Sequence, residues 1–113
     1  MHEVGIMQSV LEIADQQARA AGAVRILEIR MRVGRMTGVV QEALDHAFAV
    51  LRQDTLASDA RLEVELVPGA FWCLTCAAEF ESDDLIGGCP TCNQPSFDMR
   101  RGRELAVVSL EVD

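Results

Sequence analysis

The sequence has no tyrosine, and aromatic residues make up only 4% of its 113 residues. Basic residues are outnumbered by acidic ones, and the formal net charge is -8 at pH 7. Modules that bind nucleic acids usually combine a basic face with aromatic side chains on which bases stack. Here the basic side chains gather only at Arg100, Arg101 and Arg103, which we interpret as a solvated segment ahead of the last strand. The composition therefore argues against nucleic acid as a partner.

Long apolar runs are also missing, although half of the residues are hydrophobic. No stretch approaches the roughly 20 apolar residues that a membrane-spanning helix needs, and none resembles a secretory leader. We therefore expect a soluble, cytoplasmic protein with no membrane partner. A chain of this length buries about two thirds of its unfolded surface on folding. That is enough for one compact domain, or for a small domain with an appendage that a metal organises.

Cysteine is limited to four residues, which form two Cys-x-x-Cys units: Cys73 with Cys76, and Cys89 with Cys92. Each spacing lets a tight turn direct two sulfurs at one point, so the four thiolates suit a tetrahedral zinc ion. Two other interpretations stay open. The cysteines could form disulfides in an oxidising compartment, or one unit could be a redox pair at the start of a helix.

Four sulfurs would fill the coordination sphere of zinc and leave no position for water or substrate. We therefore expect a structural ion and not a catalytic one. Near the cysteines, the sequence has no additional His, Asp or Glu at metal-ligand spacing, and no nucleophile has a matched base. The prediction is that the protein is not an enzyme.

Hydrophobic periodicity predicts two amphipathic helices. Over residues 4–21 the apolar side chains recur at helical spacing, and Ile6, Val10 and Ile13 form the central row. The same spacing returns over residues 40–53. Both segments are long enough to cover a small sheet.

Alternation of apolar and polar residues predicts three strands, over 24–33, 62–66 and 105–112. In the first strand, Ile29 is expected on the buried face and Glu28 on the solvent face. Together with the helices, these strands predict an α/β (α+β) fold, in which two helices pack on a small three-stranded mixed sheet. A zinc-binding module with four cysteine ligands is inserted between the second and third strands.

Glycine and proline suggest where that module begins and ends. The break at Pro68-Gly69 precedes the first cysteine unit, and Gly102 follows the second. We therefore expect an α/β domain over 1–68 and 103–113, with the zinc-binding module over 69–102.

The chain begins with Met1, His2 and Glu3. A free terminal amine, the backbone nitrogen and imidazole of His2, and the amide nitrogen of Glu3 could chelate one ion in a planar array. Such nitrogen coordination suits Ni(II) or Cu(II) better than zinc. The alternative is that His2 is simply solvated at a mobile end. The only other histidine, His46, is expected to be an ordinary residue on the surface of the second helix.

Several of these features together resemble the HypA/HybF family of hydrogenase maturation proteins, along essentially the whole chain. The resemblance rests on four segments: Met1-His2-Glu3 opening an amphipathic helix, Val33-Gly34 ending a strand, the module from Cys73-x2-Cys76 to Cys89-Pro90-x-Cys92, and Gly102-Arg103-Glu104-Leu105 leading into the final strand. Cysteine units of this type occur in many zinc proteins, so the specificity comes from their combination with the Met-His-Glu start.

The resemblance implies a nickel metallochaperone. On that basis Met1, His2 and Glu3 would hold Ni2+ as a transient cargo, and Cys73, Cys76, Cys89 and Cys92 would hold structural Zn2+. Some family members carry an acidic residue near the start of the second helix. This chain departs from that pattern, because Val39, Val40 and Gln41 stand there and Glu42 follows.

The resemblance also implies partners. They are the nickel-pathway GTPase HypB, the large subunit of a [NiFe] hydrogenase and, in some relatives, urease maturation proteins. The chain itself could be a monomer or a homodimer. The competing interpretation is a zinc-ribbon adaptor that binds protein or nucleic acid and has no nickel function.

Overall fold

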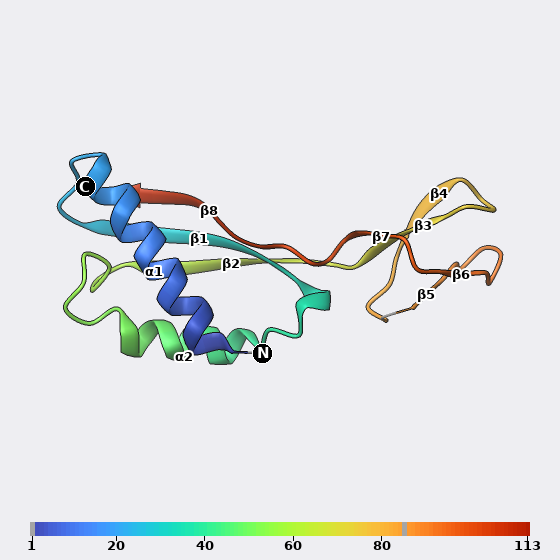
Figure 1. The fold of residues 1–113 in the computed structure, drawn as a ribbon, viewed down its shortest axis with the longest axis horizontal. Coiled ribbons are helices and arrows are strands. Elements are labelled where there is room, and N and C mark those ends of the chain that lie inside the picture. The colour runs from blue at the N-terminus through green and yellow to red at the C-terminus, as the bar shows by residue number, and fades with distance from the viewer. Residues whose placement is uncertain (1, 85) are drawn as a thin grey trace. The chain divides into compact units, whose positions relative to one another are not determined.

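The computed structural model describes residues 2–84 and 86–113, and it divides into two compact units. The helical unit comprises Met1–Arg32, Val39–Glu65 and Ala106–Asp113, and the cysteine unit comprises Val33–Gly38 and Leu66–Leu105. The elements based in the helical unit are α1 (Glu3–Ala20), β1 (Ile26–Gly34), α2 (Gln41–Leu51), β2 (Arg61–Val67) and β8 (Leu105–Val112) (Figure 1). All five lie close to the ranges that periodicity predicts.

The sheet of three strands has the order β2-β1-β8, and the hydrogen bonds at the two ends of β1 show that β1 and β8 are antiparallel. The N–H of Val24 donates to the carbonyl of Asp113 at 2.9 Å, and the N–H of Gly34 donates to that of Glu104 at 2.7 Å. The start of β1 therefore lies beside the end of β8, and its end lies beside the start of β8.

By contrast, β1 and β2 run in the same direction. Glu28 pairs with Arg61, and four residues further along both strands Arg32 pairs with Glu65. Parallel neighbours need a crossover connection, and α2 provides it between β1 and β2. The sheet is therefore mixed, which confirms the predicted fold class.

The core of the helical unit lies between the helices and one face of this sheet. Its buried side chains are Met7, Val10, Ala14 and Ala18 from α1, Leu44, Ala47 and Phe48 from α2, and Ile29 and Met31 from β1. One detail differs from the expected pattern. The sequence pattern places Ile13 in the central apolar row of α1, but its side chain is 47% exposed. The buried face of the helix is instead centred on Met7, Ala14 and Ala18.

Glu28 is the main exception to the predicted alternation in β1. The pattern predicts that it faces solvent, but only 3% of its surface is exposed. The guanidinium groups of Arg30 and Arg61 donate to its two carboxylate oxygens. Both hydrogen bonds lower the pKa of Glu28 below its ordinary value of 4.5, and the one from Arg30 has the larger effect. The carboxylate is thus held charged under the side chains of two arginines.

We expect Glu28→Gln to lower the urea midpoint of the helical unit at pH 7, because the amide leaves two guanidinium groups without their carboxylate. A folded-state pKa below 4.5 means that Glu28 stabilises the fold above that pH, and that this stabilisation is lost as the pH falls further. The difference between variant and wild type should therefore shrink in acid. Circular dichroism at 222 nm reports the unit, since both long helices belong to it.

The matched control is Glu65→Gln, which removes an exposed carboxylate paired with Arg32. Exposed pairs contribute little, so its midpoint should stay close to that of the wild type. Equal losses in both variants would contradict the role given to Glu28.

The cysteine unit contains a second sheet with the order β4-β3-β7. Its strands are β3 (Ala70–Cys73), β4 (Ala78–Glu81) and β7 (Met99–Arg101), and β3 pairs antiparallel with both neighbours. A two-stranded ladder joins β5 (Gly87–Gly88) to β6 (Pro95–Ser96). Phe71 and Phe80 stack with ring centroids 5.9 Å apart. Together with Cys73 and Cys89 they form a small buried cluster.

Two glycines in the cysteine unit permit a close approach of the backbone. A Cβ atom on Gly34 would lie 1.9 Å from the carbonyl oxygen of Gly102. Gly102 itself has a φ of +119°, which side-chain-bearing residues rarely adopt. The chain therefore needs glycine at both positions for β1 to end where it does.

In the part of the chain that the structure describes, neither helix has the length and apolar character needed to cross a membrane.

Candidate metal centre

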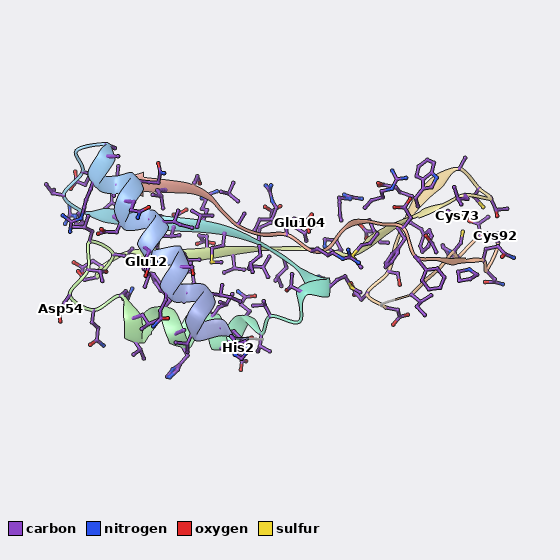
Figure 2. The ribbon with its side chains drawn as sticks, in the orientation of Figure 1. His2, Glu12, Asp54, Cys73, Cys92 and Glu104 are labelled. Carbon is purple, nitrogen blue, oxygen red and sulfur yellow. The ribbon has the colours of Figure 1, made fainter. Side chains whose placement is uncertain are left out.

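The four cysteines converge in the cysteine unit, where Figure 2 labels Cys73 and Cys92. Their sulfurs all lie within 4.8 Å of one another. Cys73 Sγ is 3.5 Å from Cys92 Sγ, and Cys76 Sγ is 4.0 Å from Cys89 Sγ. Zinc–sulfur bonds of about 2.3 Å in a tetrahedron place the sulfurs about 3.8 Å apart. The donor set and its spacing therefore fit a tetrahedral zinc ion.

Local backbone geometry directs each pair of sulfurs. Cys73 ends β3, and the next turn brings the N–H of Cys76 to 3.5 Å from Cys73 Sγ. In the second unit the N–H of Asn93 donates to the carbonyl of Cys89 at 2.8 Å. Both turns close with a left-handed residue directly after the second cysteine, Ala77 at φ +52° and Asn93 at φ +60°. The two Cys-x-x-Cys units thus end in the same backbone conformation.

The pKa values of Cys89 and Cys76 are shifted in opposite directions. Backbone N–H groups of Cys92 and Thr91 donate to the sulfur of Cys89 and lower its pKa to about 6. The pKa of Cys76 is raised to about 12, chiefly by its hydrogen-bond contact with the Cys92 sulfur. Thiolates this close repel one another, so the cluster cannot be fully deprotonated without a cation. A soft divalent ion would supply that charge.

Burial of the ligands is also uneven. Cys73 and Cys89 are buried, Cys92 is half-buried and Cys76 is exposed. A zinc ion bound by all four would have no open coordination position. Such a ligand set is typical of structural zinc sites.

The second predicted site lies at the start of the helical unit. Met1 lies outside the described residues. His2 is the N-cap of α1, and its exposed side chain makes no capping hydrogen bond. Figure 2 places it at the first turn of the helix. The first intrahelical hydrogen bond runs from the N–H of Ile6 to the carbonyl of His2. The N–H of Glu3 therefore lies outside the ladder of the helix.

The carboxylate of Glu3 has a hydrogen-bond donor that the sequence did not reveal. Its carboxylate accepts a hydrogen bond from the N–H of Val40 at 3.0 Å. Val40 is the N-cap of α2 and has no side-chain oxygen with which to cap that helix. The hydrogen bond from Val40 is the main cause that lowers the pKa of Glu3. Glu3 thus joins the first turn of α1 to the beginning of α2.

His46 lies exposed on α2, as the sequence predicts. Among the described residues, the four cysteines are the only group of three or more His, Cys, Asp or Glu side chains placed to hold one ion. A site at the start of the chain would therefore depend on backbone nitrogen as well as on His2.

Two members of the arginine group have acidic partners. Arg100 pairs with Asp98 and lies over the ring of Trp72, 4.9 Å from its centroid. Arg101 pairs with Glu79. Two of the three cations are thus already paired within the cysteine unit.

Comparison with known proteins identifies the chain. A family described as hydrogenase/urease nickel incorporation, metallochaperone, HypA matches residues 1–112. The chain belongs to the HypA family. It is 36% identical to a hydrogenase maturation factor HypA from Rhizobium leguminosarum over 112 residues, which cover 99% of each chain. A HypA from Picosynechococcus is 40% identical over 112 residues, again 99% of each chain.

Solved structures of HypA proteins share the fold. A solution structure of the nickel metallochaperone HypA from Helicobacter pylori aligns with a TM-score of 0.67 at 22% identity, covering 99% of this chain and 97% of that one. A second HypA solution structure gives a TM-score of 0.72 at 23% identity, with coverages of 99% and 96%. The HypA family is a family of metallochaperones, so the chain is a hydrogenase maturation factor and not an enzyme.

Proposed function

We propose that the protein captures Ni(II) at Met1, His2 and Glu3 and delivers it to the large subunit of a [NiFe] hydrogenase. The observation that carries this proposal is the family match over residues 1–112, which begins at the Met-His-Glu segment. The exposed His2 at the start of α1 supports it, because a carrier must take up and release its ion at an accessible position.

The beginning of α1 suits a planar nitrogen chelate. Deprotonated amide nitrogens are strong equatorial donors for Ni(II), and the N–H groups of the first helical turn have no acceptor within the helix. The carboxylate of Glu3, bound to the N–H of Val40, keeps this turn in place. We assign nickel to the nitrogens and assign this positioning role to the Glu3 carboxylate.

Release follows from the same chemistry. Binding through amide nitrogen depends on pH, because protons compete with the metal. Acidification, or a contact with a partner that displaces the terminal amine, would therefore release nickel. Nickel is a cargo in this scheme and not a resident cofactor.

Zinc would be the resident ion of Cys73, Cys76, Cys89 and Cys92. When bound, it supplies the positive charge that lets all four sulfurs be thiolates, and it links the two Cys-x-x-Cys turns. In this proposal the nickel-binding domain spans 1–68 and 103–113, and the zinc-binding module spans 69–102.

The proposed partners are the GTPase HypB, the hydrogenase large subunit and, where a urease is served, its maturation proteins, all in the cytoplasm. Nucleic acid and membranes are not part of the proposal. The acidic composition and the paired Arg100 and Arg101 are consistent with this choice.

The test is complementation of a bacterial strain that lacks its own HypA. Wild-type protein should restore hydrogenase activity at limiting nickel, and His2→Ala should not. The matched control is His46→Ala, which removes the exposed histidine of α2 and should behave like the wild type. A large excess of nickel should rescue the strain with His2→Ala. Full activity of His2→Ala at limiting nickel would instead favour a zinc-ribbon adaptor without nickel function.

A further inference from the structure

The four cysteines of the cluster differ in their access to solvent. Cys73 and Cys89 are buried and Cys92 is half-buried, but Cys76 is exposed. The chain around Cys76 is open as well, because every residue from 74 to 79 is exposed. Buried structural cysteines are usually inert. At Cys76, in contrast, a small solute can reach one sulfur of the cluster directly.

Two sulfur–sulfur contacts connect the first Cys-x-x-Cys unit to the second. Cys76 Sγ lies 4.0 Å from Cys89 Sγ, and Cys73 Sγ lies 3.5 Å from Cys92 Sγ. A disulfide bond is about 2.05 Å long, so each pair would need to close by less than about 2 Å. The exposed sulfur therefore has a buried sulfur within reach, and the other two sulfurs form a second pair.

Zinc binding would keep these sulfurs reactive toward an oxidant. A sulfur bound to zinc is a thiolate, and the thiolate is the form of cysteine that peroxides oxidise. Susceptibility to this oxidation rises with thiolate character and with exposure. Of the four cysteines, Cys76 would combine the two properties to the greatest extent.

We infer that the cluster is a peroxide-responsive site, in which Cys76 reacts first and forms a disulfide with Cys89. This site rests on the proposed function, because zinc must first hold the four sulfurs as thiolates. The co-reactant is a peroxide, and hydrogen peroxide is the smallest member of that class. Cys73 and Cys92 would then form the second disulfide.

The reaction balances in two steps. The thiolate of Cys76 attacks one oxygen of hydrogen peroxide, the O–O bond breaks, and the products are a sulfenic acid and hydroxide. The thiolate of Cys89 then attacks the sulfenic sulfur, the S–S bond forms, and the S–O bond breaks to release a second hydroxide. Each sulfur loses one electron, and the peroxide gains two. A second peroxide molecule does the same to Cys73 and Cys92.

Zinc should leave when the first disulfide forms. A structural site needs four ligands, and only Cys73 and Cys92 remain as thiolates at that point. The fold of the cysteine unit should nevertheless persist once both disulfides have formed, because each of them joins the first Cys-x-x-Cys unit to the second, as zinc does. A disulfide within one unit, such as Cys73 with Cys76, would leave the two units unconnected.

This change is suited to a reversible signal. The cytoplasm keeps thiols reduced, so the disulfides would form only while peroxide is elevated, and thiol exchange would remove them afterwards. Four thiolates and one Zn2+ carry two net negative charges, whereas two disulfides carry none. A partner that contacts the cysteine unit would therefore meet a different surface charge in the oxidised protein.

The test is treatment of zinc-loaded wild-type protein with hydrogen peroxide in the presence of a chromogenic zinc indicator. Zinc should be released as thiols are lost, and dithiothreitol with added zinc should restore both. Peptide mapping at partial oxidation should find Cys76 linked to Cys89. At full oxidation the emission of Trp72, next to Cys73 on β3, should stay near that of the zinc-loaded protein, because the two units remain joined.

Two histidine variants test the order of reaction. Three cysteines and one histidine are a known ligand set for structural zinc, so Cys76→His and Cys92→His should both still bind zinc. Cys76→His removes the exposed sulfur and should release zinc severalfold more slowly than the wild type. Cys92→His is the matched control, because it keeps the pair of Cys76 and Cys89, and it should release zinc at the wild-type rate. Peptide mapping of the wild type decides the pairing even if a variant binds no zinc.

The possible failures are distinguishable. Zinc that is retained under peroxide, a disulfide within either Cys-x-x-Cys unit, or equal rates in the two histidine variants would overturn the inference. These results would leave the proposed function intact, because nickel binding and the zinc content of untreated protein are measured separately. Untreated protein that contains no zinc would contradict the proposed zinc site, and the peroxide response with it.

Discussion

Zinc-loaded protein carrying His2→Ala should bind Ni(II) more than about 100-fold more weakly than the wild type, because it loses a direct ligand and even outer-shell changes cost about 10–100-fold. The imidazole also anchors the ion while the neighbouring amides lose their protons. Without it, nickel has only the amine and the amides, which are protonated at neutral pH. Isothermal titration of the zinc-loaded protein with Ni(II) measures the change, since filled cysteines cannot take up nickel.

The pH dependence of this binding is part of the prediction. Each amide or amine that binds nickel must release its proton, so the apparent affinity of the wild type should rise with pH. The variant should show a weaker dependence. His46→Ala is the control for loss of an exposed imidazole, and its affinity and pH dependence should match those of the wild type.

An N-terminal extension gives a second, independent variant. Two residues added before Met1 remove the terminal amine from the chelate and leave every side chain in place. Nickel binding should fall as it does in His2→Ala. If the extended protein and His2→Ala both bind nickel with unchanged affinity, the site lies elsewhere and the proposed function loses its basis.

Removal of zinc should unfold the cysteine unit and leave the helices intact. The buried cluster of this unit contains Phe71, Phe80 and two of the cysteines themselves. Without the metal, two aromatic side chains remain to offset the chain entropy of the whole unit. Structural zinc contributes about 10–16 kcal/mol of apparent binding free energy in small peptides near neutral pH. A cluster of this size cannot replace that contribution.

Two signals separate the units in this experiment. Trp72 is the only tryptophan and precedes Cys73 on β3, so its fluorescence reports the cysteine unit. After chelation, its emission should shift to the red, while circular dichroism at 222 nm should be largely kept. Adding zinc back should reverse the shift.

Cys89→Ser should give the same result without a chelator. The control is Thr75→Ser, which introduces the same side chain within the first Cys-x-x-Cys unit and removes no sulfur. Metal analysis should find one zinc in the control and none in Cys89→Ser. Thiol counting under denaturing conditions should find four free thiols in the wild type, which would exclude disulfides. Unchanged Trp72 emission in protein shown to be free of metal would contradict a structural role for the ion.

Much of the helical unit could be predicted because its elements are long. Over 18 residues of α1 and 8 of β8, periodicity is repeated often enough to identify each element. The prediction for Ile13 is wrong because the apolar residues of α1 span more of its circumference than the sheet and α2 cover. Which row is buried depends on where those neighbours lie, and local sequence does not contain that information.

The details that sequence did not reveal depend on contacts between distant residues. The alternating pattern of β1 places Glu28 on the solvent face, but the side chain of Arg61 from β2 pairs with it and covers it. The strands of the cysteine unit have two to four residues, which is too short for alternation to be recognised. The hydrogen bond from Val40 to Glu3 joins residues 37 positions apart. The cysteine cluster, in contrast, was predictable, because two short spacings already determine its chemistry.

The approach of Gly34 to the carbonyl of Gly102 also limits how this chain can evolve. Any other amino acid at position 34 would place its Cβ atom in a steric clash with that oxygen. No substitution of Gly34 is therefore expected to be tolerated. Gly5 and Gly88 have no neighbouring atom within 4 Å of an added Cβ, and alanine at Gly5 would favour α1 by about 1 kcal/mol. Neutral drift is therefore open at Gly5 and Gly88 and closed at Gly34, although all three are the same amino acid.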